Sequence, residues 1–184
     1  AGEEGPLATG IALASAVMYV RQALLTAILA PAAARPLAIL LAPAGIVAWS
    51  AAVIAWRTDS RAAPTSRHAP GKPFHLLPAF GFLLAVAASA LFVRWVQSAL
   101  GEVAAAWSLF LAGTMDVDTA IVTLASLPHG AIGPQLAALA LGGAAAANMA
   151  FKIGVAVVNA GWAAGRTAVL ALVASEVVLL ATLA

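Results

Sequence analysis

The sequence predicts an all-α polytopic membrane protein with about six transmembrane helices, one of them discontinuous or re-entrant, and an internal repeat. Of the 184 residues, 64% are hydrophobic and 9% are charged. Soluble domains carry about 25% charged residues. The mean hydropathy is +1.02. The chain therefore has too few charged side chains to cover a water-facing surface, and its long apolar stretches fit a bilayer better than a soluble core.

The apolar stretches long enough to cross a bilayer, which takes about 20 helical residues, are 8–30, 36–56, 76–98, 103–126, 134–160 and 167–184. The first two form a hairpin whose turn is bracketed by Pro31 and Pro36, with Arg35 at the polar end. We treat residues 1–184 as a single transmembrane domain. Its repeat-like halves, about 7–56 and 103–184, are linked by a loop at 57–75 and a helix at 76–98.

Residues 57–75 form a polar loop that is rich in proline and in basic residues. The loop contains four of the nine lysine and arginine residues, at positions 57, 61, 67 and 72. Because positive charge accumulates in loops that stay on the cytoplasmic side, we expect this loop to be cytoplasmic.

The stretch 103–126 contains two carboxylates, Asp116 and Asp118, in the middle of apolar sequence. Carboxylates facing lipid cost several kcal/mol, so a regular lipid-exposed helix is disfavoured there. Gly113 permits a break in the backbone, after which Asp116 can cap a second half-helix. The stretch then either crosses once as a broken helix or enters and leaves on the same side.

The chain also resembles itself at a spacing of about 131 residues. Arg21 aligns with Lys152, and Arg35 aligns with Arg166 without a gap. If the stretch 103–126 crosses the membrane, the two copies run parallel. If it is re-entrant, they are inverted, which is an architecture of secondary transporters.

Three segments resemble one bacterial family. These are residues 72–76, residues 112–120 with their Asp-Val-Asp sequence, and the pair Asn148 and Lys152. Together they are similar to the uncharacterised C-terminal membrane domain of MgtC/SapB-like proteins. The resemblance implies the bacterial cytoplasmic (inner) membrane and a loose connection to magnesium and ion homeostasis. It also implies an upstream MgtC-like region as a partner, and an alanine where this chain has Thr119.

Asp116 and Asp118 are the candidate ion ligands, because carboxylate oxygens suit Mg²⁺, Na⁺ or a proton. On a regular helix the two side chains would point about 200° apart, so both can bind one ion only if the backbone unwinds. In the other interpretation, one aspartate caps the half-helix and the other pairs with Arg21 or Lys152. The sequence leaves these interpretations open.

Further polar residues lie inside the predicted spans. Arg21 and Lys152 are either gating ion-pair partners of the aspartates or static salt bridges that fix helix register. Asn148 shares a helix face with Lys152 and either orients a substrate or hydrogen-bonds between helices. Glu176, in the last span, is a candidate relay carboxylate.

Several function classes are disfavoured. The chain has no cysteine, and its three histidines lie in predicted loops without the spacing of a metal site. It lacks the sequence signatures of serine hydrolases, P-loop NTPases and dinucleotide-binding enzymes, so we expect neither an enzyme nor a bound cofactor. The net charge of +2 does not favour nucleic-acid binding.

The function that these features favour is a transporter or permease for a small cation or proton. Asp116 and Asp118 would bind the ion, and Arg21 and Lys152 would compete for the carboxylates. The alternative is a non-transporting membrane subunit that regulates or stabilises a partner complex. In either case the expected partners are the lipid bilayer and either an upstream MgtC-like domain or further copies of the chain.

Overall fold

The computed structural model describes residues 4–59, 84, 87–88, 91–96, 98–164 and 166–184, and this part of the chain contains helices and no strand. The labelled helices are α1 (Glu4–Leu29), α2 (Pro31–Asp59), α4 (Glu102–Met115), α5 (Val117–Ser126), α6 (Pro134–Ala164) and α7 (Arg166–Leu183). Residues 91–96 and 98–100 are helical as well. Most of the predicted loop at 57–75, and much of the predicted helix at 76–98, lie outside the described residues.

The turn between α1 and α2 is shorter than predicted. Ala30 is the one residue between the two helices, and α2 continues through Pro36 and Pro43. The predicted turn between Pro31 and Pro36 is therefore wrong. Pro31 is the first residue of α2. The N–H of a first helical residue has no acceptor within the helix, so a proline is tolerated there. This proline therefore begins the helix instead of preceding it. Arg35 lies within α2 and is exposed.

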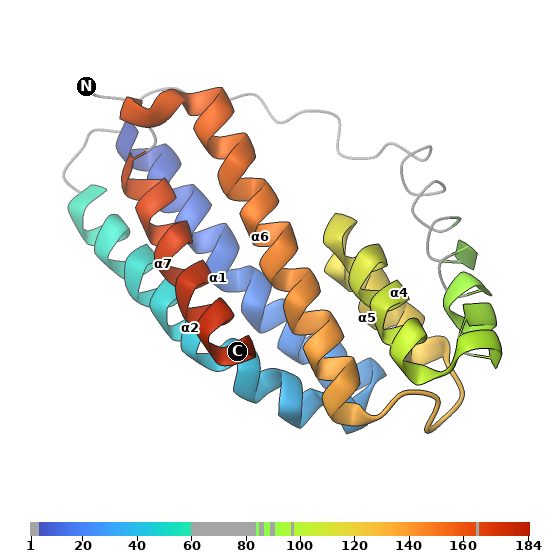
Figure 1. The fold of residues 1–184 in the computed structure, drawn as a ribbon. Coiled ribbons are helices and arrows are strands. Elements are labelled where there is room, and N and C mark those ends of the chain that lie inside the picture. The colour runs from blue at the N-terminus through green and yellow to red at the C-terminus, as the bar shows by residue number, and fades with distance from the viewer. Residues whose placement is uncertain (1–3, 60–83, 85–86, 89–90, 97, 165) are drawn as a thin grey trace.

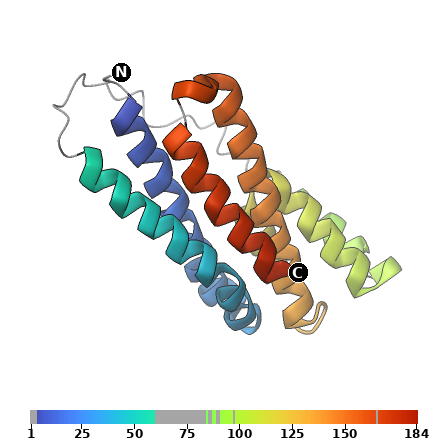
Figure 2. The ribbon, with the colours of Figure 1, turned by 60° about the vertical axis from the view of Figure 1, so that its left-hand side comes forward.

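Two helical hairpins run in opposite directions. Helix α1 runs from the upper end of the bundle to the lower end and α2 returns, whereas α6 runs upward and α7 returns downward (Figure 1). Figure 2 shows the same four helices side by side from a second direction. Helix α2 packs against α1, α6 and α7. The helices that the sequence predicts as repeat copies thus run in opposite directions, which is the direction expected for the inverted arrangement.

The predicted stretch 103–126 is divided into α4 and α5, which form a hairpin of their own. Helix α4 runs upward and α5 returns toward the lower end, where the chain continues into α6 (Figure 1). The beginning of α4 is tied to the beginning of α6, because Oε2 of Glu102 accepts a 3.0 Å hydrogen bond from the N–H of Gly133. The predicted discontinuity is thus confirmed, and the hairpin does not run from one end of the bundle to the other.

Helix α4 packs very closely against α6. A Cβ atom placed on Gly113 would lie 2.6 Å from the Cβ of Ala144 and 3.1 Å from the Cβ of Ala120. Gly113 itself is helical, and the backbone break comes later, at Asp116. The break that the sequence suggested at Gly113 is therefore not there. Gly113 instead permits the close contact between α4 and α6.

Two of the described helices, Pro31–Arg57 and Pro134–Gly154, are long and apolar enough by length and composition to cross a membrane. A buried core joins both hairpins and includes Leu41, Leu141 and Leu179. A second buried cluster joins Val93 to the α4–α5 hairpin and the beginning of α6. The α4–α5 hairpin is thereby held against the α1/α6 side of the bundle.

Candidate functional site

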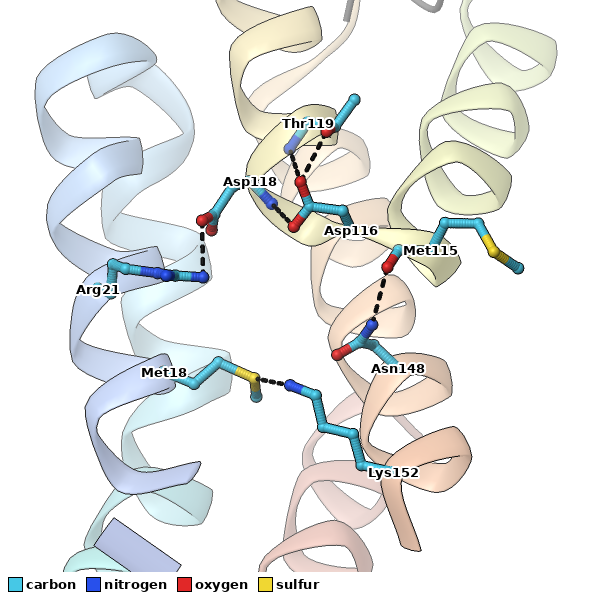
Figure 3. Close-up of polar contacts among 8 residues, drawn as sticks. All are labelled: Met18, Arg21, Met115, Asp116, Asp118, Thr119, Asn148 and Lys152. Atoms are coloured by element: carbon cyan, nitrogen blue, oxygen red, sulfur yellow. Dashed lines mark hydrogen bonds and ion pairs between the residues drawn. The ribbon is translucent and has the colours of Figure 1, made fainter. Parts of the chain in front are cut away.

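Asp116 connects α4 to α5 and caps the second helix. Its backbone is extended, with φ −154° and ψ 112°, which ends α4. Its Oδ1 accepts a 3.3 Å hydrogen bond from the N–H of Asp118, and its Oδ2 accepts from the N–H of Thr119 at 3.2 Å. The Thr119 hydroxyl donates to the same Oδ2 at 2.7 Å (Figure 3). The predicted N-cap is confirmed, and both oxygens of Asp116 are engaged by α5.

Asn148 of α6 contacts the end of α4 beside this break. Its Nδ2 lies 3.2 Å from the carbonyl oxygen of Thr114 and 3.3 Å from that of Met115. The last carbonyls of a helix have no partner within the helix, so an amide donor from a neighbouring helix supplies one. Asn148 thus fastens the tip of the α4–α5 hairpin to α6, as Figure 3 shows.

Asp118, in the first turn of α5, pairs with Arg21 of α1. The distance between Oδ2 of Asp118 and Nη2 of Arg21 is 2.7 Å. The carboxylate side is mostly buried, with 20% of the Asp118 side chain exposed, whereas 57% of the Arg21 side chain is exposed. Oδ1 of Asp118 is buried and has no hydrogen-bond partner among the described residues. Asp118 therefore has one oxygen in an ion pair and one buried oxygen without a partner among the described residues.

Lys152 of α6 approaches the same region from the other repeat. Its Nζ lies 3.0 Å from Sδ of Met18, and Figure 3 shows it below the Arg21–Asp118 pair. A thioether sulfur is a weak acceptor, so this contact does not neutralise the ammonium charge. Arg21 and Lys152 are the cations that the repeat aligns, and both lie near one carboxylate, with Arg21 in contact with it.

Five residues that the sequence singled out surround one polar cavity of about 160 Å³. They are Arg21, Asp116, Asp118, Asn148 and Lys152, and the lining also includes Met18, Gln22, Met115 and Val117. The two cations balance the two carboxylates, so the cavity has no net formal charge. A cation that enters must therefore compete with a side chain that is already in place.

Some features of the site were not identified from the sequence. The Thr119 hydroxyl strengthens the cap, Met18 contacts Lys152, and Gln22 lines the cavity. The spacing of Met18, Gln22 and the neighbouring Arg21 on one helix was a signal for this polar patch. Glu176 does not line the cavity, and it lies in α7, where its side chain is buried.

The cavity is not a preformed multidentate metal site. Among the described residues, no group of three or more histidine, cysteine, aspartate or glutamate side chains is placed to hold a metal ion. With both Asp116 oxygens engaged in the cap, Asp118 supplies the free carboxylate oxygen. The arrangement suits one exchangeable cation or proton at a single carboxylate, with help from neutral oxygens.

The comparisons with known proteins give one match. No curated protein and no solved structure matches the chain. Residues 1–160 match the model of a family described as a domain of unknown function (DUF4010). The family does not itself name MgtC or SapB, so that link stays a prediction. Because the match covers most of the sequence, the chain belongs to the DUF4010 family.

Proposed function

We propose that the protein is a membrane permease for a small cation or proton, and that Asp118 is the group that binds the ion. The observation that carries the proposal is the position of this carboxylate. It lies in the first turn of a half-helix, with one oxygen on Arg21 and one oxygen buried without a partner among the described residues. Ionisable groups inside a transmembrane bundle mark ion pathways more often than packing.

A membrane setting is supported by the outward-facing side chains. Many large apolar residues on the bundle surface are more than half exposed, among them Leu24, Ile28, Ile39, Ile46, Leu111 and Leu180. Soluble monomers rarely expose contiguous apolar patches of such extent. In a bilayer these side chains would contact lipid, and the α4–α5 hairpin would be a re-entrant pair that enters from the side opposite the loop at 57–75.

The architecture supports transport. Inverted repeats with discontinuous helices near the midplane are the plan of many secondary transporters, in which one half moves against the other around a fixed site. Here Arg21 comes from one repeat and Lys152 from the other. Movement of the halves would change which cation is closest to Asp118.

The mechanism that follows is competition between a mobile ion and a tethered one. A cation entering the cavity displaces the Arg21 guanidinium from Asp118, and the free Oδ1 and nearby neutral oxygens replace part of its water shell. Arg21 then stays at the polar cavity that it lines. When the ion leaves, the ion pair forms again and keeps the carboxylate from remaining unpaired.

The alternative is a non-transporting subunit, and one observation favours it. Both oxygens of Asp116 accept hydrogen bonds in the cap, and Asp118 is paired with Arg21. The Arg21–Asp118 ion pair can therefore also be a permanent connection between α1 and α5. Such a subunit would bind an MgtC-like domain or another copy of the chain through its apolar surface.

Ion flux into proteoliposomes that contain the purified chain tests the proposal. Mg²⁺, Na⁺ and H⁺ are measured separately, beside the double variant Asp116→Asn/Asp118→Asn. Flux that the folded double variant abolishes supports a permease and names its ion. Equal flux from both proteins would remove Asp118 from the pathway. No flux from either, together with a defined co-purifying membrane partner, would favour the subunit.

A further inference from the structure

Glu176 is a buried carboxyl group that the proposed ion site does not use. It lies in the middle of α7, and 8% of its surface is exposed. Its Oε2 atom is buried and has no hydrogen-bond partner among the described residues. A buried carboxylate without a cation or several donors is strongly disfavoured, whereas the neutral acid is tolerated. The surroundings of Glu176 therefore favour a carboxyl group that carries a proton.

The helices that pack against α7 offer no cation to Glu176 within the described part of the chain. Helix α2 has no ionisable side chain between Arg35 and Arg57. The one ionisable residue of α6 is Lys152, and its Nζ contacts Met18. From α1, Tyr19 interacts with Ser175 and Glu176 of α7, and the guanidinium of Arg21 is paired with Asp118. The polar group that α1 offers to Glu176 is thus a hydroxyl and not a cation.

A buried polar connection leads from Tyr19 to the ion site. Tyr19 and Gln22 share one face of α1, and they are 3% and 1% exposed. Oε1 of Gln22 is buried without a hydrogen-bond partner among the described residues, and the Tyr19 hydroxyl is buried beside Ser175 of α7. Gln22 also lines the cavity that contains Asp118. A buried polar atom without a partner is unusual in a packed interior and needs an explanation, such as a water molecule or a role in proton transfer.

The repeat shows that packing alone does not require a carboxyl group here. At the spacing of about 131 residues, the position equivalent to Glu176 is Gly45. A Cβ atom on Gly45 would lie 3.6 Å from the Cβ of Tyr19. Both positions of the repeat therefore face Tyr19, and the half that contains α7 has a carboxyl group where the other half has no side chain.

We propose that Glu176 is a proton site, and that uptake of a monovalent cation at Asp118 is exchanged for the proton of Glu176. The inference rests on the proposed function, since it names what the permease exchanges. In the step, the O–H bond of the Glu176 carboxyl breaks. The proton moves past Tyr19 and Gln22 to water in the cavity, and the carboxylate stays in the bundle. The cation bound at Asp118 keeps the net charge of the bundle unchanged, and reprotonation of Glu176 on the return step completes the exchange.

Infrared spectroscopy of the purified protein tests the proton site without any transport. A buried protonated carboxyl group gives a carbonyl band that shifts in D₂O and titrates with pH. We expect this band in the wild type and in Glu102→Gln, since Glu102 is an exposed carboxylate on α4. We expect it to be lost in Glu176→Gln and shifted in Glu176→Asp, which keeps the carboxyl group if the amide variant does not fold. A band that persists unchanged in Glu176→Gln would overturn the proposal.

Flux measurements test the exchange and separate the two proposals. In liposomes, cation uptake by the wild type should drive proton release and should vary with pH, whereas uptake by Glu176→Gln should release no protons. If Asp118→Asn abolishes uptake while Glu176→Gln still releases protons as the wild type does, the exchange is wrong and the permease stands. If no variant transports but the infrared band belongs to Glu176, the proton site stands, and the permease and the exchange fail together.

Discussion

Asp118 and Arg21 form an ion pair between α5 and α1, with 2.7 Å between Oδ2 of the carboxylate and Nη2 of the guanidinium. Asp118 lies in the first turn of the half-helix α5, and Arg21 lies on α1. In the predicted repeat these helices belong to different halves. An ion pair between the two halves is either a lock that must open during transport or a permanent tie. The predictions below separate these roles.

Removing the competing cation should strengthen ion binding. In Arg21→Gln we expect the Kd of the transported cation to fall about fivefold, because an exposed ion pair contributes up to about 1 kcal/mol. Isothermal titration calorimetry of the detergent-purified protein measures the change. The double variant Arg21→Gln/Asp118→Asn is the control and should not bind. An unchanged Kd in Arg21→Gln would mean that the ion does not compete with the guanidinium.

The close contact between α4 and α6 should not tolerate a methyl group. Gly113→Ala places a Cβ atom 2.6 Å from the Cβ of Ala144, and we expect a loss of about 1–3 kcal/mol in the free energy of unfolding. The double variant Gly113→Ala/Ala144→Gly should recover part of the lost stability, since the contact of the new methyl group with Ala120 remains. Unfolding in mixed micelles measures both variants. Full stability of Gly113→Ala would show that the hairpin does not pack against α6 in this way.

The amide of Asn148 should stabilise the tip of the hairpin. Asn148→Leu removes the donor to the carbonyls of Thr114 and Met115, and we expect a loss of about 1–2 kcal/mol in the free energy of unfolding. Gln135→Leu is a matched control, because Gln135 is an exposed amide on the same helix. The same loss in both variants would show that the effect comes from adding leucine and not from the hydrogen bonds.

The inverted arrangement can be tested by labelling. The chain has no cysteine, so single cysteines can be introduced at Ala32, His129 and Arg57. Ala32 and His129 line one surface pocket at the lower end of the bundle, whereas Arg57 lies in the last turn of α2 near the upper end. A membrane-impermeant maleimide should label the first two from the same side and Arg57→Cys from the other. Labelling of His129→Cys and Arg57→Cys from one side would mean that the hairpin crosses the membrane.

Local chemistry in the sequence predicted local structure well. Asp116 after Gly113 inside an apolar stretch indicates a half-helix with an N-cap, and the structure has both. The turn between Pro31 and Pro36 was wrong, because a proline that starts a helix and one that precedes it give similar sequence patterns. Gly113 was interpreted as a break because the sequence does not distinguish a glycine that permits a turn from one that permits close packing. The contact with Ala144 of α6 shows which role it has.

Relationships between distant segments could not be predicted in the same way. Apolar periodicity is identical in a helix that crosses and in a half-helix that returns, so the direction of the second repeat depended on the path of α4 and α5. The sequence offered Arg21 and Lys152 as partners for two aspartates. Which pair forms depends on the rotation of α1 and α6 about their axes, and this is set by packing at residues such as Met149.

The most direct test of the ion site compares two isosteric variants, Asp118→Asn and Asp116→Asn, by initial cation flux into proteoliposomes. Asparagine is as good an N-cap as aspartate, so Asp116→Asn should keep the hairpin and most of the flux. Asp118→Asn removes the carboxylate with the free oxygen and should reduce the flux to that of empty liposomes. Wild-type flux in folded Asp118→Asn, or an equal loss in both variants, would contradict the account.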